Sequence, residues 1–95
     1  MPRPRKCRRI GWRANATYFK PRGIPMRSLN EISLSLEEAE SVRLKDLLGL
    51  EQTTAAKKMN TSQSTFQRIL SSARRKIALA IIEGRALRIQ KKSEQ

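Results

Sequence analysis

The chain has 95 residues, with 21 lysines and arginines against 8 aspartates and glutamates, no histidine and a single cysteine, Cys7. The length indicates one small domain, and a lone cysteine without histidines excludes a disulfide framework and a metal site of the Cys/His kind, so we expect no metal and no cofactor. The net charge of +13 instead favours a polyanionic partner, either nucleic acid or an anionic membrane surface.

No apolar run in the sequence is long enough to cross a membrane. The longest, "IALAII" at 77–82, is far shorter than the roughly 20 residues that a membrane-spanning helix needs. The basic start of the chain lacks the apolar segment of a secretory signal peptide. We therefore expect a cytoplasmic, nucleoid-associated protein with no membrane partner.

Residues 1–33 are expected to form a basic N-terminal arm and loop. Residues 1–27 carry nine basic side chains and no acidic one, and prolines and glycines interrupt the segment. "ATYFK" (16–20) favours a short extended piece, and the aromatic residues Trp12, Tyr18 and Phe19 suggest that part of the arm packs on the body. The first cations could form a minor-groove arm or an undirected basic tail, and both interpretations stay open: Arg3, Arg5, Lys6, Arg8 and Arg9.

A helical domain is expected over residues 34–89, and its first helix begins after Ser35. "SLEE" (35–38) is a capping box, in which the Ser35 hydroxyl accepts from the Glu38 amide and the Glu38 carboxylate accepts from the Ser35 amide. Glu37, Glu38 and Glu40 suit the positive end of a helix, so we interpret them as capping residues rather than catalytic acids. The apolar face consists of Leu36, Ala39, Leu44 and Leu47, and Gly49 ends the helix.

A short second helix is predicted from about Gln52 to Met59. Ala55, Ala56 and Met59 form its inward side, where two alanines allow a crossing helix to approach closely. Asn60 tolerates the left-handed conformation that ends a helix, and Ser62 is a good N-cap for the next one.

The third predicted helix has two different faces. At 100° per residue, the core side lies around Phe66 and consists of Ile69, Leu70, Ala73, Ile77, Ala80 and Ile81. The opposite side is polar and cationic: Ser64, Arg68, Ser71 and Arg75, flanked by Gln67 and Arg74. Gly84 is expected to end the helix.

The end of this helix is apolar nearly all round, because Leu79 and Ile82 point away from the core side. Something must cover this stretch: the N-terminal arm, "ALRI" (86–89) or a second copy of the chain. A homodimer is therefore one of three open alternatives. Residues 90–95 are expected to form a disordered tail.

The predicted order of elements matches a helix-turn-helix. It consists of a helix, a short second helix, a tight turn and a third helix with one polar side. Its second helix enters the DNA major groove N-terminus first, so its early exposed side chains should be hydrogen-bonding groups that pair with base edges. The expected base-contacting residues are Gln63, Ser64, Gln67 and Arg68. The expected phosphate-contacting residues are Lys57, Lys58, Ser62, Thr65, Arg74 and Arg75.

The segment "LSLEEAESVRLKDLLGLEQTTAAKKMNTSQSTFQRILSSARRKI" resembles the fourth-region helix-turn-helix of sigma factors, which recognises promoter DNA. Together with "MPRPRKCRRI", "YFKPRGIP" and "EGRALRI", residues 1–89 resemble a family of small, uncharacterised prokaryotic proteins that are predicted to bind DNA. The resemblance implies a fold and a DNA-binding role but no target. Asn60 and Thr61 depart from the usual glycine and apolar residue of the turn, and Lys58 replaces an apolar residue, so no sigma target sequence is carried over.

We therefore expect an all-α, non-enzymatic protein that binds double-stranded DNA sequence-specifically and regulates transcription. One alternative is a nucleoid-type or RNA-binding basic protein that makes no sequence choice. Another is an adaptor that docks on RNA polymerase through "IALAII".

Overall fold

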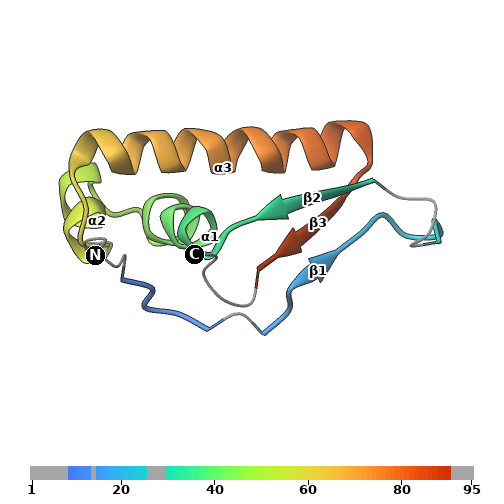
Figure 1. The fold of residues 1–95 in the computed structure, drawn as a ribbon, viewed down its shortest axis with the longest axis horizontal. Coiled ribbons are helices and arrows are strands. Elements are labelled where there is room, and N and C mark those ends of the chain that lie inside the picture. The colour runs from blue at the N-terminus through green and yellow to red at the C-terminus, as the bar shows by residue number, and fades with distance from the viewer. Residues whose placement is uncertain (1–8, 14, 26–29, 91–95) are drawn as a thin grey trace, which may run out of the picture.

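The computed structural model describes residues 9–13, 15–25 and 30–90, which form an α+β domain (Figure 1). The helices are α1 (Leu36–Val42), continued by the π-helical segment η2 (Arg43–Leu47), then α2 (Gln52–Lys58) and α3 (Gln63–Glu83). The strands are β1 (Tyr18–Phe19), β2 (Glu31–Leu34) and β3 (Ala86–Ile89).

The three strands form one mixed sheet in the order β1-β3-β2. The strand β3 pairs antiparallel with β1, opposing Leu87 to Phe19, and parallel with β2, opposing Leu87 to Ile32. The sheet lies beside the C-terminal half of α3, while α2 packs near the start of that helix (Figure 1). The predicted all-α class is therefore wrong.

The short extended piece expected at 16–20 contains β1, whereas β2 and β3 escaped the sequence analysis because each is short and finds its partner far along the chain. The exposed-buried alternation of β2 covers only four residues, which is a weak period-2 signal. Leu34 is buried together with Ala39, Ala73 and Ile89, and its pairing partner Ile89 belongs to the chain after α3. Gln90, the first residue of the expected tail, continues this contact by donating its N–H to the Leu34 carbonyl at 2.9 Å.

The local signals for the helix ends are confirmed. Ser35 and Glu38 form the reciprocal capping box, with N···O distances of 2.9 and 3.0 Å. Asn60 adopts the left-handed conformation with φ 58° between α2 and α3, and Gly84 does so with φ 66° at the end of α3. These are the positions where an Asn or Gly avoids the steric cost of a positive φ.

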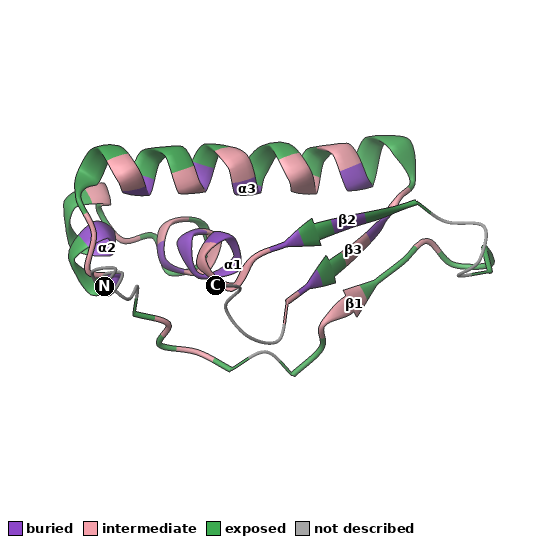
Figure 2. Cartoon of the chain, viewed as in Figure 1, coloured by how far each residue is buried: buried purple, intermediate pink, exposed green. Residues whose placement is uncertain are grey.

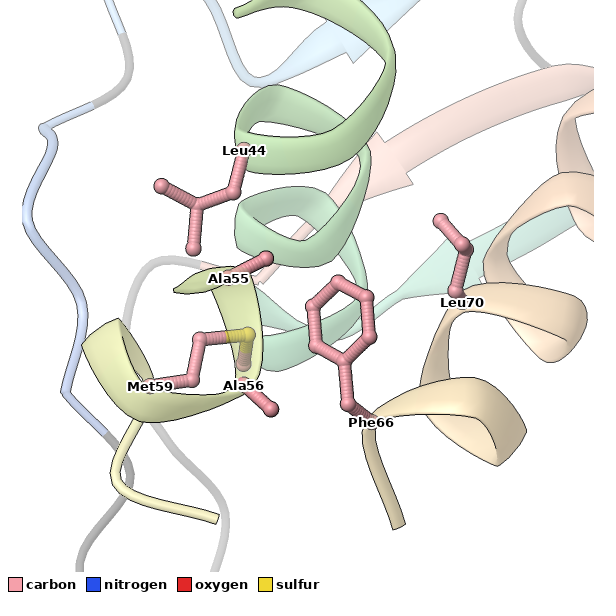
Figure 3. Packing of buried hydrophobic residues seen from close by; sticks show 6 residues of the cluster. All are labelled: Leu44, Ala55, Ala56, Met59, Phe66 and Leu70. Carbon is pink, nitrogen blue, oxygen red and sulfur yellow. The ribbon is translucent and has the colours of Figure 1, made fainter. Parts of the chain in front are cut away.

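Two clusters of buried side chains hold the domain together. The first joins α1–η2, α2 and the start of α3, as Figure 3 shows: Leu44, Ala55, Ala56, Met59, Phe66 and Leu70. The second joins α1 and α3 to the sheet: Leu34, Ala39, Ala73 and Ile89. Trp12 packs against the second cluster, as expected, whereas Phe19 is half exposed.

One leucine and one isoleucine that were predicted to lie in the core are exposed in the structure. Leu47 is 76% exposed because it ends the π-helical segment, in which Leu48 donates to the Arg43 carbonyl five residues earlier and the side chains leave the 100° spacing. Ile81 is 72% exposed because Ala80 is the last buried residue of α3, and Figure 2 shows the last turn of this helix coloured as exposed.

Candidate nucleic-acid interface

The turn between α2 and α3 is built from short local hydrogen bonds. Thr61 donates its N–H to the Ala56 carbonyl at 3.0 Å, which closes the end of α2 around Asn60. The Ser62 hydroxyl then accepts from the Thr65 N–H at 3.2 Å and caps α3, as predicted. The start of α3 is thus fixed relative to α2 by backbone geometry and by the burial of Phe66 and Leu70.

The four side chains expected to contact bases are all exposed on the first two turns of α3: Gln63, Ser64, Gln67 and Arg68. The side chain of Gln67 donates to the Ser71 hydroxyl at 3.2 Å. The side chain of Gln52 reaches the Gln63 carbonyl at 3.5 Å, linking the start of α2 to the start of α3. The structure therefore places these four residues on one helix and outside the core.

The side chains expected to contact phosphates fall into two groups. Lys57, Lys58 and Arg75 are exposed. The hydroxyls of Ser62 and Thr65 are already used locally, because Ser62 caps α3 and donates to the Thr65 hydroxyl at 3.0 Å. These two residues would have to share their hydroxyls with a phosphate.

Arg74 is engaged by an acidic side chain that the sequence analysis did not pair with it. Its guanidinium donates two hydrogen bonds to Asp46 of η2, at 2.5 and 3.1 Å. The hydrogen bond to Asp46 raises the pKa of Arg74, and the same contact lowers the pKa of Asp46. A phosphate at Arg74 would have to compete with this carboxylate.

The expected N-terminal arm is only partly within the described residues. Arg3, Arg5, Lys6 and Arg8 lie outside them. Arg9 is exposed, and its backbone N–H donates to the Met59 carbonyl at the end of α2, at 3.2 Å.

Glu40 has a role that the sequence analysis missed. It was interpreted as a capping residue, but the structure buries it to 1% exposure, where it accepts from Arg43 at 2.7 and 3.0 Å. It also accepts the backbone N–H of Gly11 at 2.9 Å. The i,i+3 spacing of Glu40 and Arg43 was the only signal for this pair in the sequence.

The described residues show no clustering of three or more potential metal ligands. In the same part of the chain, no helix has the length and apolarity needed to cross a membrane.

Comparison with known proteins places the chain in a family but not in a functional class. The model of the family "Protein of unknown function DUF134" matches residues 1–94. A UPF0251 protein of Dehalococcoides mccartyi is 60% identical over 90 residues, which cover 95% of this chain and 77% of the relative. UPF0251 proteins of Pelotomaculum thermopropionicum and Desulforudis audaxviator are 56% and 53% identical, over 94% and 95% of this chain and 67% and 59% of the relatives.

No solved structure matches the chain significantly. The sequence matches extend over nearly the whole chain. The chain belongs to the DUF134 family, whose matched relatives carry the name UPF0251.

Proposed function

We propose that this protein is a non-enzymatic regulator that binds double-stranded DNA sequence-specifically, with α2, the turn at Asn60 and α3 acting as a helix-turn-helix. One observation carries the proposal. The first two turns of α3 expose four hydrogen-bonding side chains, while Phe66 and Leu70 on the same turns are buried against α2. A helix fixed from one side and polar on the other has the form that major-groove reading requires.

The chemistry of the exposed face suits base recognition. Glutamine side chains can pair bidentately with adenine in the major groove, and arginine with guanine. Gln67 and Arg68 are therefore the residues assigned to direct base contacts, with Gln63 and Ser64 beside them. The alternative of a merely solvated helix face explains their polarity but not the surrounding charge.

That surrounding charge favours a polyanion. Residues 57–76 contain six cations and no acidic residue: Lys57, Lys58, Arg68, Arg74, Arg75 and Lys76. Lys76 is used inside the domain, where it pairs with Glu38 at 2.8 Å, and Arg74 is paired with Asp46. Lys57, Lys58 and Arg75 are thus the side chains best placed to contact phosphates on both sides of the reading residues.

In vitro selection from a random duplex pool at physiological salt tests this proposal. We expect a sequence motif to be enriched among the duplexes that remain bound. Tight binding at low salt without any enrichment would contradict sequence-specific binding and would favour the nucleoid-type alternative. A parallel titration with single-stranded and duplex RNA distinguishes that alternative from an RNA-binding protein.

A protein partner is a second candidate, and the exposed end of α3 favours it. Ile81 and Ile82 are 72% and 81% exposed, so two neighbouring apolar side chains near the end of α3 are accessible to a partner. RNA polymerase or a second copy of the chain could cover them. Sedimentation of the protein alone and with purified polymerase would detect either partner, and the substitution Ile82→Asp should abolish the complex.

A further inference from the structure

Asp46 and Arg74 form an ion pair that joins η2 to α3 on the surface of the domain. The Nε and one terminal nitrogen of Arg74 donate to the two Asp46 carboxylate oxygens, at 3.1 and 2.5 Å. Leu44, two residues before Asp46, is buried in the first core cluster. Leu70, one turn before Arg74, is buried in the same cluster. The packing of the core therefore brings the two charged side chains together.

Arg74 lies on the same side of α3 as Gln67, one of the residues assigned to base contacts. Seven residues separate the two, which at 100° per residue is two turns with a rotation of about 20°. Arg75 is related to Arg68 in the same way, and both arginines are exposed. They continue the exposed face of α3 about 10 Å beyond the reading residues. At that distance from the N-terminus of a recognition helix, side chains meet phosphates rather than base edges.

The two neighbouring arginines differ in whether an acidic side chain holds them. Among the residues that the structure describes, none forms an ion pair with Arg75. Arg74 has both of its hydrogen bonds to Asp46. The chain thus offers two adjacent cations on one helix face, of which one is free for a phosphate and the other is occupied.

The exposure of the Asp46–Arg74 pair argues against a mainly structural role. The side chains of Arg74 and Asp46 are 51% and 38% exposed, whereas the carboxylate in the Lys76–Glu38 pair is only 9% exposed. An exposed ion pair changes the folding equilibrium by about fivefold at most. The domain therefore does not need this pair to fold, and another anion can compete for Arg74.

The Asp46 carboxylate makes the contact with Arg74 that a DNA phosphate would make. Arginine binds both anions through the planar fork of its N–H donors. Because two of these donors are used by Asp46, a phosphate can take the same place only after the carboxylate leaves. A carboxylate that stayed beside the phosphate would repel it.

We propose that Asp46 is a built-in competitor of DNA, whose carboxylate withholds Arg74 from the phosphate backbone and so limits the affinity of the protein for duplexes of any sequence. Arg75 makes the corresponding phosphate contact without a competitor. The inference rests on the proposed DNA-binding function and names a residue that limits it.

The salt dependence of affinity for a mixed-sequence duplex, measured by fluorescence anisotropy, tests this inference. Each phosphate contact contributes about 0.9 to the salt slope, which is about 3.5-fold in affinity between 50 and 200 mM salt. Arg75→Ala should reduce the slope by about 0.9, whereas Arg74→Ala should change it by less than about 0.3. Asp46→Asn should steepen the slope by about 0.9 and tighten binding at 50 mM salt by roughly three- to tenfold.

A double-mutant cycle shows whether Asp46 acts through Arg74. In the Arg74→Ala background, Asp46→Asn should tighten binding by about twofold at most, because a single exposed charge without a contact is largely screened by salt. Circular dichroism checks that these variants fold. The comparison of Arg74→Ala with Arg75→Ala tests the inference even without the Asp46 variant.

Glu83→Gln is the matched control for the lost negative charge. It frees Arg85 from an ion pair of 2.6 Å at the last residue of α3, at the opposite end of the helix from the reading residues. The salt slope should then change by less than about 0.3.

The outcomes separate this inference from the proposed function. If the unchanged protein binds no duplex, the DNA-binding function is wrong and the inference falls with it. If the protein binds DNA but Arg74→Ala reduces the slope as much as Arg75→Ala, Asp46 does not withhold Arg74. If Asp46→Asn weakens binding, or tightens it equally with and without Arg74, the carboxylate positions Arg74 or acts only through its charge, and the inference is overturned.

Discussion

At the scale of single residues, Glu38 joins the start of α1 to α3 through its side chain. Its carboxylate accepts from the Ser35 N–H at the start of α1, from the Ser72 hydroxyl, and from the Lys76 ammonium on α3. Lys76 also donates to the Ser33 carbonyl of β2 at 2.8 Å. The capping box that the sequence predicts is therefore also the link between α1, α3 and the sheet.

Glu38 predicts a dependence of stability on pH. Burial raises its pKa, but hydrogen bonds from Lys76, Ser72 and Ser35 outweigh burial, so its pKa in the folded protein lies below 4.5. A lowered pKa stabilises the folded state above pH 4.5, and this contribution is lost as the pH falls through the folded-state pKa. Glu38→Gln should thus lower the free energy of unfolding at pH 7 by about 2 kcal/mol.

Urea denaturation of both proteins at pH 7 and pH 3 measures this effect. The difference between wild type and Glu38→Gln should be smaller at pH 3, because this pH lies below 4.5 and part of the stability that the charged carboxylate contributes is lost there. Glu51→Gln is the control, because Glu51 is exposed and makes no side-chain cap. An equal difference at both pH values would show that the charge of Glu38 does not matter.

For the candidate site, the sequence predicted which side chains point into solvent but not which of them pair with other side chains. The 100° spacing places Arg68 opposite Phe66 and Gln67 beside that opposite side, and the structure exposes both. The spacing could not reveal that Arg74 is paired with Asp46, because the partner lies 28 residues away in the sequence. For the same reason it could not reveal that Glu40 accepts from Gly11, which is 29 residues away.

At the scale of elements, the helices and the short extended piece around Tyr18 and Phe19 were predictable, whereas β2, β3 and their pairing into a sheet were not. Each helix carries its own end signals within a few residues, such as Ser62 before α3 and Gly84 after it. The strand β3 is defined instead by its pairing with β1 and β2. Paired residues lie 55 positions apart in the sequence between β2 and β3, and 68 or 70 positions apart between β1 and β3. The π-helical segment also escaped prediction, because its hydrogen bonds depend on the packing at the end of α1.

The central position of β3 predicts that the sheet depends on it entirely. The strands β1 and β2 pair with β3 but not with each other, and Ala86 and Ile89 of β3 are buried. A chain that ends at Gly84 should therefore lose cooperative thermal unfolding, because the second core cluster loses its cover. Circular dichroism against temperature measures this.

A chain that ends at Gln90 is the matched control, because it keeps β3 and its contact with Leu34. It should unfold at the temperature of the full chain. If the chain ending at Gly84 unfolds cooperatively at the same temperature, the sheet contributes nothing to the stability of the helical part.

At the scale of the whole molecule, charge is divided between the ends of the sequence and its middle. Residues 28–56 contain six acidic side chains against Arg43 and Lys45, whereas residues 1–27 contain no acid. In the structure two of these six acidic side chains, Glu38 and Glu40, are buried, and Asp46 pairs with Arg74. The basic side chains of Lys57 and Lys58 face solvent at the end of α2, just before the turn that leads to α3.

The most direct test of base reading by α3 uses the duplex that selection enriches. Affinity is measured for that duplex and for a series with each base pair replaced in turn, using wild type, Arg68→Ala and Arg75→Ala. We predict that Arg68→Ala loses about 1–3 kcal/mol of discrimination at one base pair and little elsewhere. Arg75→Ala should weaken binding to every duplex alike. If Arg68→Ala also weakens every duplex alike, then Arg68 does not read bases and the exposed face of α3 is not a recognition surface.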